Sequence, residues 1–256
     1  MCSPPNRLQS RPGKWISLGD LTADLTRPCV LDIKIGRIQH TPDFSEAKRL
    51  ESLEKVFFVC FCLFFLVGSA RVDCVFARFF SQCVCSSSHC AQVNSSTSRT
   101  LGLRICGMKL WSHRTNQASS ATKNWGKKSV TESNFTAALA RFVDDEHVDG
   151  PRRSLPPLFA DRVSALVDAI ESTDHQLRWI STSVLLLYDS AATTEEALQR
   201  SASVHLIDFA NTWPAAESFS KDEVGFEDGL RTLASKLREV TAYNCWPTTY
   251  EYPPLL

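Results

Sequence analysis

The chain has 256 residues, enough for one large domain or two small ones. Lysine plus arginine and aspartate plus glutamate number 28 each, so nothing indicates a chain-wide cationic surface for nucleic acid or anionic membranes, although a local cationic pocket stays compatible with this balance. Apolar residues at 43% and charged residues at 22% are typical of a soluble globular protein.

The first predicted element is a short strand in PCVLDIKIG, residues 28–36, which is bounded by a proline and a glycine. Side chains alternate faces along a strand, so Asp32 and Lys34 share one face. The opposite face is apolar and carries Leu31, Ile33 and Ile35. The local pattern by itself favours an ion pair on a half-exposed strand, and a pair of groups with a chemical role is the alternative.

Residues 56–92 differ in composition from both of their flanks. They hold six of the ten cysteines and eight of the fifteen phenylalanines, whereas the preceding DFSEAKRLESLEK has the spacing of a charged amphipathic helix. The other cysteines (Cys2, Cys29, Cys106 and Cys245) are scattered, which is typical of free thiols in a reducing compartment. The N-terminal sequence MCSPPNRLQSRPGKW has no apolar core, so a secretory signal is not expected there.

Three interpretations of residues 56–92 compete. A membrane helix has only the fifteen uncharged residues 56–70 available, against the ~20 needed to span a bilayer. A zinc site has suitable atoms but none of the usual spacings, in Cys83, Cys85, His89 and Cys90. A retained intron is favoured, because valine codons begin with GT, a glutamine codon can end in AG, and removal of the block joins its flanks in frame.

A polar turn followed by a strand is predicted in VNSSTSRTLGLRICGMKLW, residues 93–111. Gly102, Arg104 and Gly107 within this strand are interpreted as structural residues. Lys109 is expected to be an exposed lysine, and a role in binding is the alternative.

A helix is predicted next, in residues 159–179, and it is interpreted as core scaffold. Its apolar positions at helical spacing are Phe159, Val163, Leu166, Val167 and Ile170. The apolar strand STSVLLLYD, residues 181–189, follows, with Ser181 and Ser183 at its start, where hydroxyl residues are usually turn residues.

The last predicted strand is VHLIDFANT, residues 204–212, with one acid, Asp208, in an apolar run. Burial of an unpaired carboxylate is costly, so we expect Asp208 to meet a cation. Pairing with a nearby arginine is the purely structural interpretation.

In content and order, PCVLDIKIG, STSRTLGLRICGM, STSVLLLYD and VHLIDFANT resemble the motifs of the inositol polyphosphate kinase family. The family pattern P-x-x-x-D-x-K-x-G is met by Pro28, Asp32, Lys34 and Gly36, and its I-D-F tripeptide by residues 207–209. The resemblance covers about residues 14–55 and 93–240, which we expect to form a partial kinase domain. Residues 1–13 are then a disordered N-terminus, 56–92 an insert and 241–256 a tail.

The resemblance implies an α+β, kinase-like C-terminal lobe, in which an antiparallel sheet carries Asp32, Lys34 and Asp208 and helices pack on it. The implied activity is ATP-dependent transfer of a phosphoryl group to inositol polyphosphates. It needs positioning, neutralisation of charge and an acceptor for the hydroxyl proton. The CGM sequence, residues 106–108, is more similar to the multikinase and hexakisphosphate kinase branches than to the trisphosphate 3-kinases.

The resemblance also implies roles for individual residues. Asp32 would lie at the accepting hydroxyl, and Lys34 would contact phosphate, for which a lysine ammonium is well suited. Asp208 would hold Mg²⁺ on the phosphates of ATP, with Ser183 near the metal and the nucleotide. We expect a cytoplasmic or nuclear protein with no nucleic-acid partner, and no membrane partner unless residues 56–80 form an anchor.

The chain departs from the family pattern at several places. Asn211 stands where histidine is usual, and DEVGFEDGL, residues 222–230, approximates D-x-G-Y-x-x-G-L with one extra residue. The family's N-terminal lobe, with its ATP-binding lysine and hinge, is expected before Trp15, where fourteen residues stand. A non-catalytic remnant of a kinase, or a membrane-anchored protein, is therefore the alternative.

Overall fold

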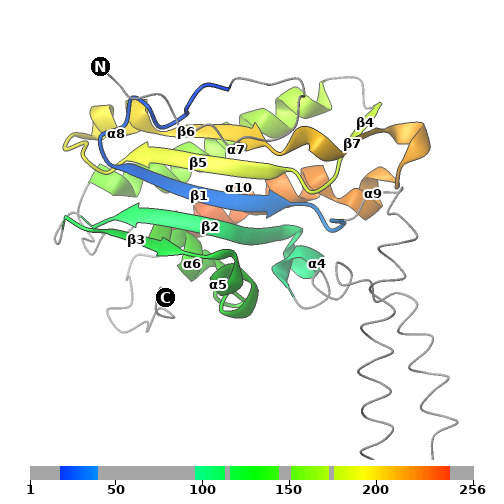
Figure 1. The fold of residues 1–256 in the computed structure, drawn as a ribbon, viewed down its shortest axis with the longest axis horizontal. Coiled ribbons are helices and arrows are strands. Elements are labelled where there is room, and N and C mark those ends of the chain that lie inside the picture. Colours follow the sequence, from blue (N-terminus) through cyan, green and yellow to red (C-terminus); the bar gives the residue numbers. More distant parts are fainter. Residues whose placement is uncertain (1–17, 40–95, 113–115, 144–150, 173–175, 243–256) are drawn as a thin grey trace, which may run out of the picture.

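The central feature of the computed structural model is an antiparallel sheet with strand order β3-β2-β1-β5-β6, in a chain described over residues 18–39, 96–112, 116–143, 151–172 and 176–242 (Figure 1). Its strands are β1 (Pro28–Ile35), β2 (Leu103–Trp111), β3 (Ala118–Ala121), β5 (Ser183–Asp189) and β6 (Ser203–Ile207). A separate two-stranded ribbon pairs β4 (Leu177–Trp179) with β7 (Thr212–Pro214). Of the strands described, β1 is the middle one, so its two faces define the two sides of the sheet.

Strand β1 alternates between buried and half-buried residues, as its sequence predicts. One face is fully buried and consists of Cys29, Leu31, Ile33 and Ile35. The other carries Asp32 and Lys34, which are partly accessible. The strand stops at Gly36, whose φ of +99° favours glycine and whose position leaves no room for a side chain, because a Cβ would lie 2.9 Å from the Val224 carbonyl oxygen.

Three helices cover the apolar face of the sheet and lie behind it in Figure 1: α6 (Phe135–Val143), α7 (Leu155–Glu171) and α10 (Phe226–Ala242). Helix α7 has two prolines in its first turn, where the missing N–H groups cost no helical hydrogen bond. Helix α10 packs against α6 and α7 and also contacts β1 and β2. Its buried stripe follows helical spacing and includes Phe226, Leu230, Leu233, Leu237 and Val240.

Short helices complete the part of the chain that the structure describes. They are α4 (Thr97–Leu101), α5 (Lys123–Lys128), α8 (Glu195–Ser201), α9 (Lys221–Val224) and three 3₁₀ turns at Pro151–Ser154, Phe209–Asn211 and Ala215–Glu217. Helix α5 packs directly on β2, since a Cβ on Gly126 would overlap the Ile105 carbonyl oxygen. Lys109 on β2 is exposed, as expected.

Two sequence predictions need correction in extent. The helix predicted over 159–179 begins earlier, at Leu155, and ends at Glu171, and residues 177–179 form β4 instead because they pair with β7. The predicted polar turn before β2 contains helix α4, which ends at Gly102 in a left-handed conformation. For residues 177–179, pairing with the distant strand β7 outweighs the helical pattern of the sequence. Before β2, the left-handed C-cap at Gly102 ends a short helix that the sequence pattern did not indicate.

Residues 56–92 lie outside the described part of the chain, and so do the candidate zinc ligands and the alternative membrane segment within them. The amphipathic segment before residue 56 also lies outside it. Over the ranges that the structure does describe, none of the helices combines the length and the apolarity needed to cross a bilayer.

Candidate active site

A lysine of β1 and the aspartate that follows β6 meet on the side of the sheet opposite α7 and α10. Lys34 Nζ lies 3.1 Å from Asp208 Oδ2. The sheet register explains the contact, because Lys34 on β1 pairs with Ser183 on β5, and Ser183 pairs with Ile207, the last residue of β6. Asp208 follows immediately, so one row across three strands brings the two charges together.

Asp208 was predicted to lie buried within a strand, and this is wrong in detail. It follows β6 with φ of +67°, a left-handed conformation that aspartate tolerates better than most residues, and its side chain is 57% exposed. The expected cationic partner is present, but it is Lys34 rather than an arginine. The exposed carboxylate is therefore held on one side by a lysine and open to solvent on the other.

Asp32 shares the face of Lys34 but forms no ion pair with it in the described residues, so the simple surface-pair interpretation of the strand does not hold. Burial raises the pKa of the Asp32 carboxyl, and the Ser183 hydroxyl and the Lys34 ammonium offset only part of this rise. Asp32 Oδ1 and Ser183 Oγ are both buried without a hydrogen-bond partner of standard geometry among the residues described. A carboxylate with a raised pKa is a better proton acceptor near neutral pH than an ordinary one.

The backbone opposite Asp32 carries no side chain. Gly107 on β2 lies opposite Asp32 in the register, and a Cβ placed there would meet no atom within 4 Å. There is therefore free space beside β2 at Gly107, next to a carboxylate whose Oδ1 is buried.

The two serines at the start of β5 have different positions. Ser183 is fully buried between β1 and β6, whereas Ser181 lies before the strand and contacts Lys34 directly. The Ser181 carbonyl oxygen accepts a hydrogen bond from Lys34 Nζ at 2.7 Å, and its Oγ lies 3.3 Å from the same nitrogen. The predicted site residue Ser183 is therefore buried beside Lys34 and Asp32 and is not exposed to solvent.

A buried arginine on this face was missed as a functional candidate. Arg104 on β2 pairs with Lys34 in the register and is only 2% exposed. Its Nη2 donates to Gln39 Oε1 at 2.6 Å, but its Nε and Nη1 are buried with no acceptor among the residues described. In the sequence, Arg104 stands between two apolar residues, Leu103 and Ile105. Because side chains alternate along a strand, this pattern places the arginine on the face opposite the apolar core, and it is the signal that could have identified Arg104.

Two lysines of helix α5, Lys123 and Lys127, add positive charge to that of Lys34 and Arg104. The charge of Lys123 acts to lower the pKa of Asp32. Burial lowers the pKa of Lys127, and the nearby charges of Arg104 and Lys123 lower it further. Lys34, Arg104, Lys123 and Lys127 are thus linked by electrostatic effects on Asp32 or on one another, and we call these four residues the cationic cluster, which a zero net charge conceals.

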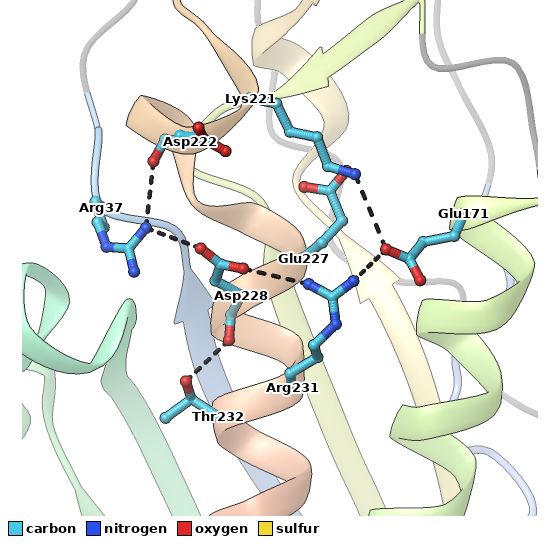
Figure 2. Close-up of polar contacts among 8 residues, drawn as sticks. All are labelled: Arg37, Glu171, Lys221, Asp222, Glu227, Asp228, Arg231 and Thr232. Atoms are coloured by element: carbon cyan, nitrogen blue, oxygen red, sulfur yellow. Dashed lines mark hydrogen bonds and ion pairs between the residues drawn. The ribbon is translucent and has the colours of Figure 1, made fainter.

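A second charged network lies just beyond the C-terminal end of β1, and its acidic and basic side chains pair with one another (Figure 2). Arg37 donates to the Asp222 carbonyl oxygen and pairs with Asp228 at 3.1 Å, and Arg231 pairs with Asp228 and Glu171. A further contact joins Lys221 to the buried Glu227 at 3.2 Å. This network fastens the segment 222–230 against the end of β1, which gives the approximate family pattern there a structural role.

Asp208 is the residue best placed to hold a divalent cation. Within the described ranges, no group of three or more His, Cys, Asp or Glu side chains could enclose an ion. A single exposed carboxylate nevertheless fits Mg²⁺, which keeps several waters and is usually bound by one or two carboxylates together with substrate phosphates. The donor set therefore suits a metal that arrives with a nucleotide.

Comparison with known proteins supports the kinase resemblance. Inositol hexakisphosphate kinase 3 from Mus musculus is 28% identical over 247 residues, which cover 89% of this chain and 51% of that protein. Inositol hexakisphosphate kinase 1 from Saccharomyces cerevisiae is 28% identical over 201 residues, covering 77% of this chain and 15% of that protein. The chain thus spans about half the length of the mouse relative and less of the yeast one.

The fold has a solved counterpart. The structure of inositol phosphate multikinase Ipk2 from S. cerevisiae, in complex with ADP and Mn²⁺, has a TM-score of 0.58 and 20% identity, and covers 86% of this chain and 81% of that one. This similarity confirms the predicted α+β, kinase-like fold. The sequence profile for inositol polyphosphate kinase matches residues 15–238, and this chain therefore belongs to the inositol polyphosphate kinase family.

Proposed function

We propose that this chain transfers the γ-phosphoryl group of ATP to an inositol polyphosphate. The observation that carries the proposal is that Asp32 and Lys34 share one face of β1 and that Lys34 is paired with Asp208. We assign these residues the roles of proton acceptor, phosphate ligand and metal ligand, respectively. These are the parts that phosphoryl transfer to a hydroxyl needs, since catalysis rests on positioning and charge neutralisation. Family membership supports the same reaction class.

Each residue has a distinct proposed role. Asp32 accepts the proton of the substrate hydroxyl, and its raised pKa suits it to that task at neutral pH. Lys34 donates hydrogen bonds to phosphate, and Asp208 binds Mg²⁺ together with the phosphates of ATP. When bound, the divalent cation neutralises charge on the transferring phosphoryl group. Support for a nucleotide and a divalent metal comes from the ADP and Mn²⁺ in the multikinase structure.

The cationic cluster supports a polyphosphate as the acceptor. Arg104 brings a buried guanidinium with two nitrogens unpaired among the residues described, and burial of such a group is costly unless an anion reaches it. Lys123 and Lys127 add charge close to Asp32 and Arg104. A ligand with several phosphates could pair with the Arg104 guanidinium and with other cations of the cluster together.

Incubation of the purified chain with ³²P-labelled ATP, Mg²⁺ and a panel of inositol polyphosphates tests the proposal. We expect a phosphorylated inositol product that requires Mg²⁺ and is absent with the Asp208→Asn variant. Isothermal titration of ATP–Mg²⁺ and of the inositol polyphosphates is the parallel measurement. Binding of both without transfer would indicate a non-catalytic relative, and binding of neither would refute the proposal.

A further inference from the structure

Among the residues that the structure describes, the Lys34 ammonium has three acceptors, and two of them belong to Ser181. The Ser181 carbonyl oxygen lies at 2.7 Å, Asp208 Oδ2 at 3.1 Å and Ser181 Oγ at 3.3 Å. A lysine ammonium has three N–H donors, so these contacts occupy all of them. Lys34 can reach a phosphate only if one of its present acceptors is given up.

The backbone of Ser181 is held in an unusual conformation from both sides. Its φ is +60°, in the left-handed region that residues other than glycine seldom adopt. The Ile180 N–H donates to the Asn211 carbonyl at 3.1 Å, and the Thr182 carbonyl accepts from Ile35 N–H at 2.9 Å. The two residues that flank Ser181 are therefore held in place: Ile180 is bonded to the segment after β6, and Thr182 is bonded to the last residue of β1. The bend between them turns the Ser181 carbonyl toward Lys34.

Of the three acceptors, the Asp208 carboxylate is the one that a divalent cation would bind. Its carboxylate is 57% exposed, whereas the Lys34 side chain is only 15% exposed and cannot follow the carboxylate into solvent without leaving Ser181. When Asp208 turns to a cation, the Ser181 carbonyl and hydroxyl still hold two N–H groups of Lys34. The third N–H is then free for a phosphate.

We propose that Ser181 is a positioning residue for Lys34: its left-handed backbone keeps the ammonium in place when Asp208 is engaged by metal and nucleotide. The inference rests on the proposed function, because it assumes that Lys34 contacts phosphate and that Asp208 binds the cation. It adds a residue that touches neither and acts only through Lys34.

Two matched variants separate the backbone from the hydroxyl. Ser181→Gly and Ser181→Val both remove Oγ, but glycine adopts the left-handed conformation freely and valine resists it. With saturating ADP and Mg²⁺, we expect Ser181→Val to weaken the affinity for inositol hexakisphosphate by about tenfold or more and Ser181→Gly by about threefold or less. Without ADP and Mg²⁺ the effect of valine should be smaller, because Asp208 still holds Lys34.

The same variants in a Lys34→Met background show whether Ser181 acts through Lys34. We expect the valine effect on affinity to disappear there, and urea unfolding of the same ligand-free chains to show a coupling between positions 34 and 181. Equal weakening by valine in both backgrounds, or by glycine and valine alike, would overturn the inference. If valine prevents folding, Ser181→Ala takes its place and must still weaken binding more than glycine does.

These measurements distinguish failure of the inference from failure of the proposed function. If the unsubstituted chain binds neither ADP–Mg²⁺ nor inositol hexakisphosphate, the proposed function fails, whatever coupling the unfolding measurements show. If it binds both and the affinity does not depend on the backbone at Ser181, only the positioning role fails.

Discussion

Lys34 and Asp208 are 174 positions apart in sequence, and Lys34 Nζ lies 3.1 Å from Asp208 Oδ2. They meet because β5 pairs on one side with β1, which carries Lys34, and on the other with β6, which Asp208 follows. The contact holds an exposed carboxylate beside a lysine that is mostly buried. The carboxylate that we propose as a metal ligand and the ammonium that we propose as a phosphate ligand are thus adjacent in the fold.

Asp208→Asn should abolish the Mg²⁺-dependent part of nucleotide binding and of phosphoryl transfer while the chain stays folded. The amide keeps the shape of the side chain but lacks the charge that holds a divalent ion. Titration of ADP with and without Mg²⁺ measures the effect, with Asp161→Asn as control because Asp161 is exposed on α7 and its only described ion pair is with Arg238. Activity within a few-fold of the unsubstituted chain would exclude the metal role.

Lys34→Ala should raise KM for the inositol polyphosphate and lower kcat together. An ammonium that touches the substrate or the transferred phosphate contributes to binding and to stabilisation of the transition state. Steady-state kinetics with varied inositol polyphosphate checks this, and Lys109→Ala is the control, since Lys109 is an exposed lysine on the neighbouring strand. If Lys34 served only as one side of a surface ion pair, the kinetic constants would be unchanged.

Asp32→Asn should lower kcat by about 10²-fold or more with little change in KM, because the amide keeps a hydrogen-bonding shape but cannot accept a proton. Burial raises the pKa of Asp32 above 3.8, so the rate of the unsubstituted chain should fall as the pH drops through that raised pKa. The pH–rate profile of the variant should lack this fall. An unchanged kcat would return Asp32 to a structural role.

Asp189→Asn should cost about 1–3 kcal/mol of stability at neutral pH. Burial acts to raise the pKa of Asp189, but hydrogen bonds from the N–H groups of Ala191, Thr26 and Arg27 outweigh it and leave the pKa below 3.8. This stabilisation is therefore present above pH 3.8 and is lost as the pH falls through the lowered pKa. Urea unfolding across that range, with the exposed Asp24→Asn as control, should show the variant and the unsubstituted chain converging only at low pH.

Gly229→Ala should destabilise the chain by about 1–3 kcal/mol in spite of the better helix propensity of alanine. A Cβ there would lie 2.6 Å from the Gly102 carbonyl oxygen and 2.8 Å from Ile35 Cγ2, so α10 would have to move away from β1. Gly107→Ala is the matched control and should change the free energy of unfolding by about 0.5 kcal/mol or less, since its Cβ would meet nothing within 4 Å. Similar unfolding midpoints for the two variants would contradict the close packing of α10 on β1.

The sequence by itself determined the features that depend on local pattern. Alternation in residues 28–36 predicted which side chains of β1 are buried, and apolar spacing predicted α7, because burial selects one face of a strand or helix wherever the chain is placed. The order of short motifs identified the family, which the profile match confirms. The proposed roles of Asp32 and Lys34 rest on the same motifs and stay predictions.

Only the tertiary structure decided what these residues face. Strand register, set by pairing between distant segments, made Asp208 the partner of Lys34, placed Ser181 beneath the ammonium and brought Arg104 alongside. The left-handed turns at Ser181 and Asp208 have no strong sequence signal, because a serine and an aspartate adopt that conformation only where their neighbours hold them in it. Local sequence fixes which face a side chain occupies, but long-range pairing chooses its neighbours, and the chemistry of this site depends on the neighbours.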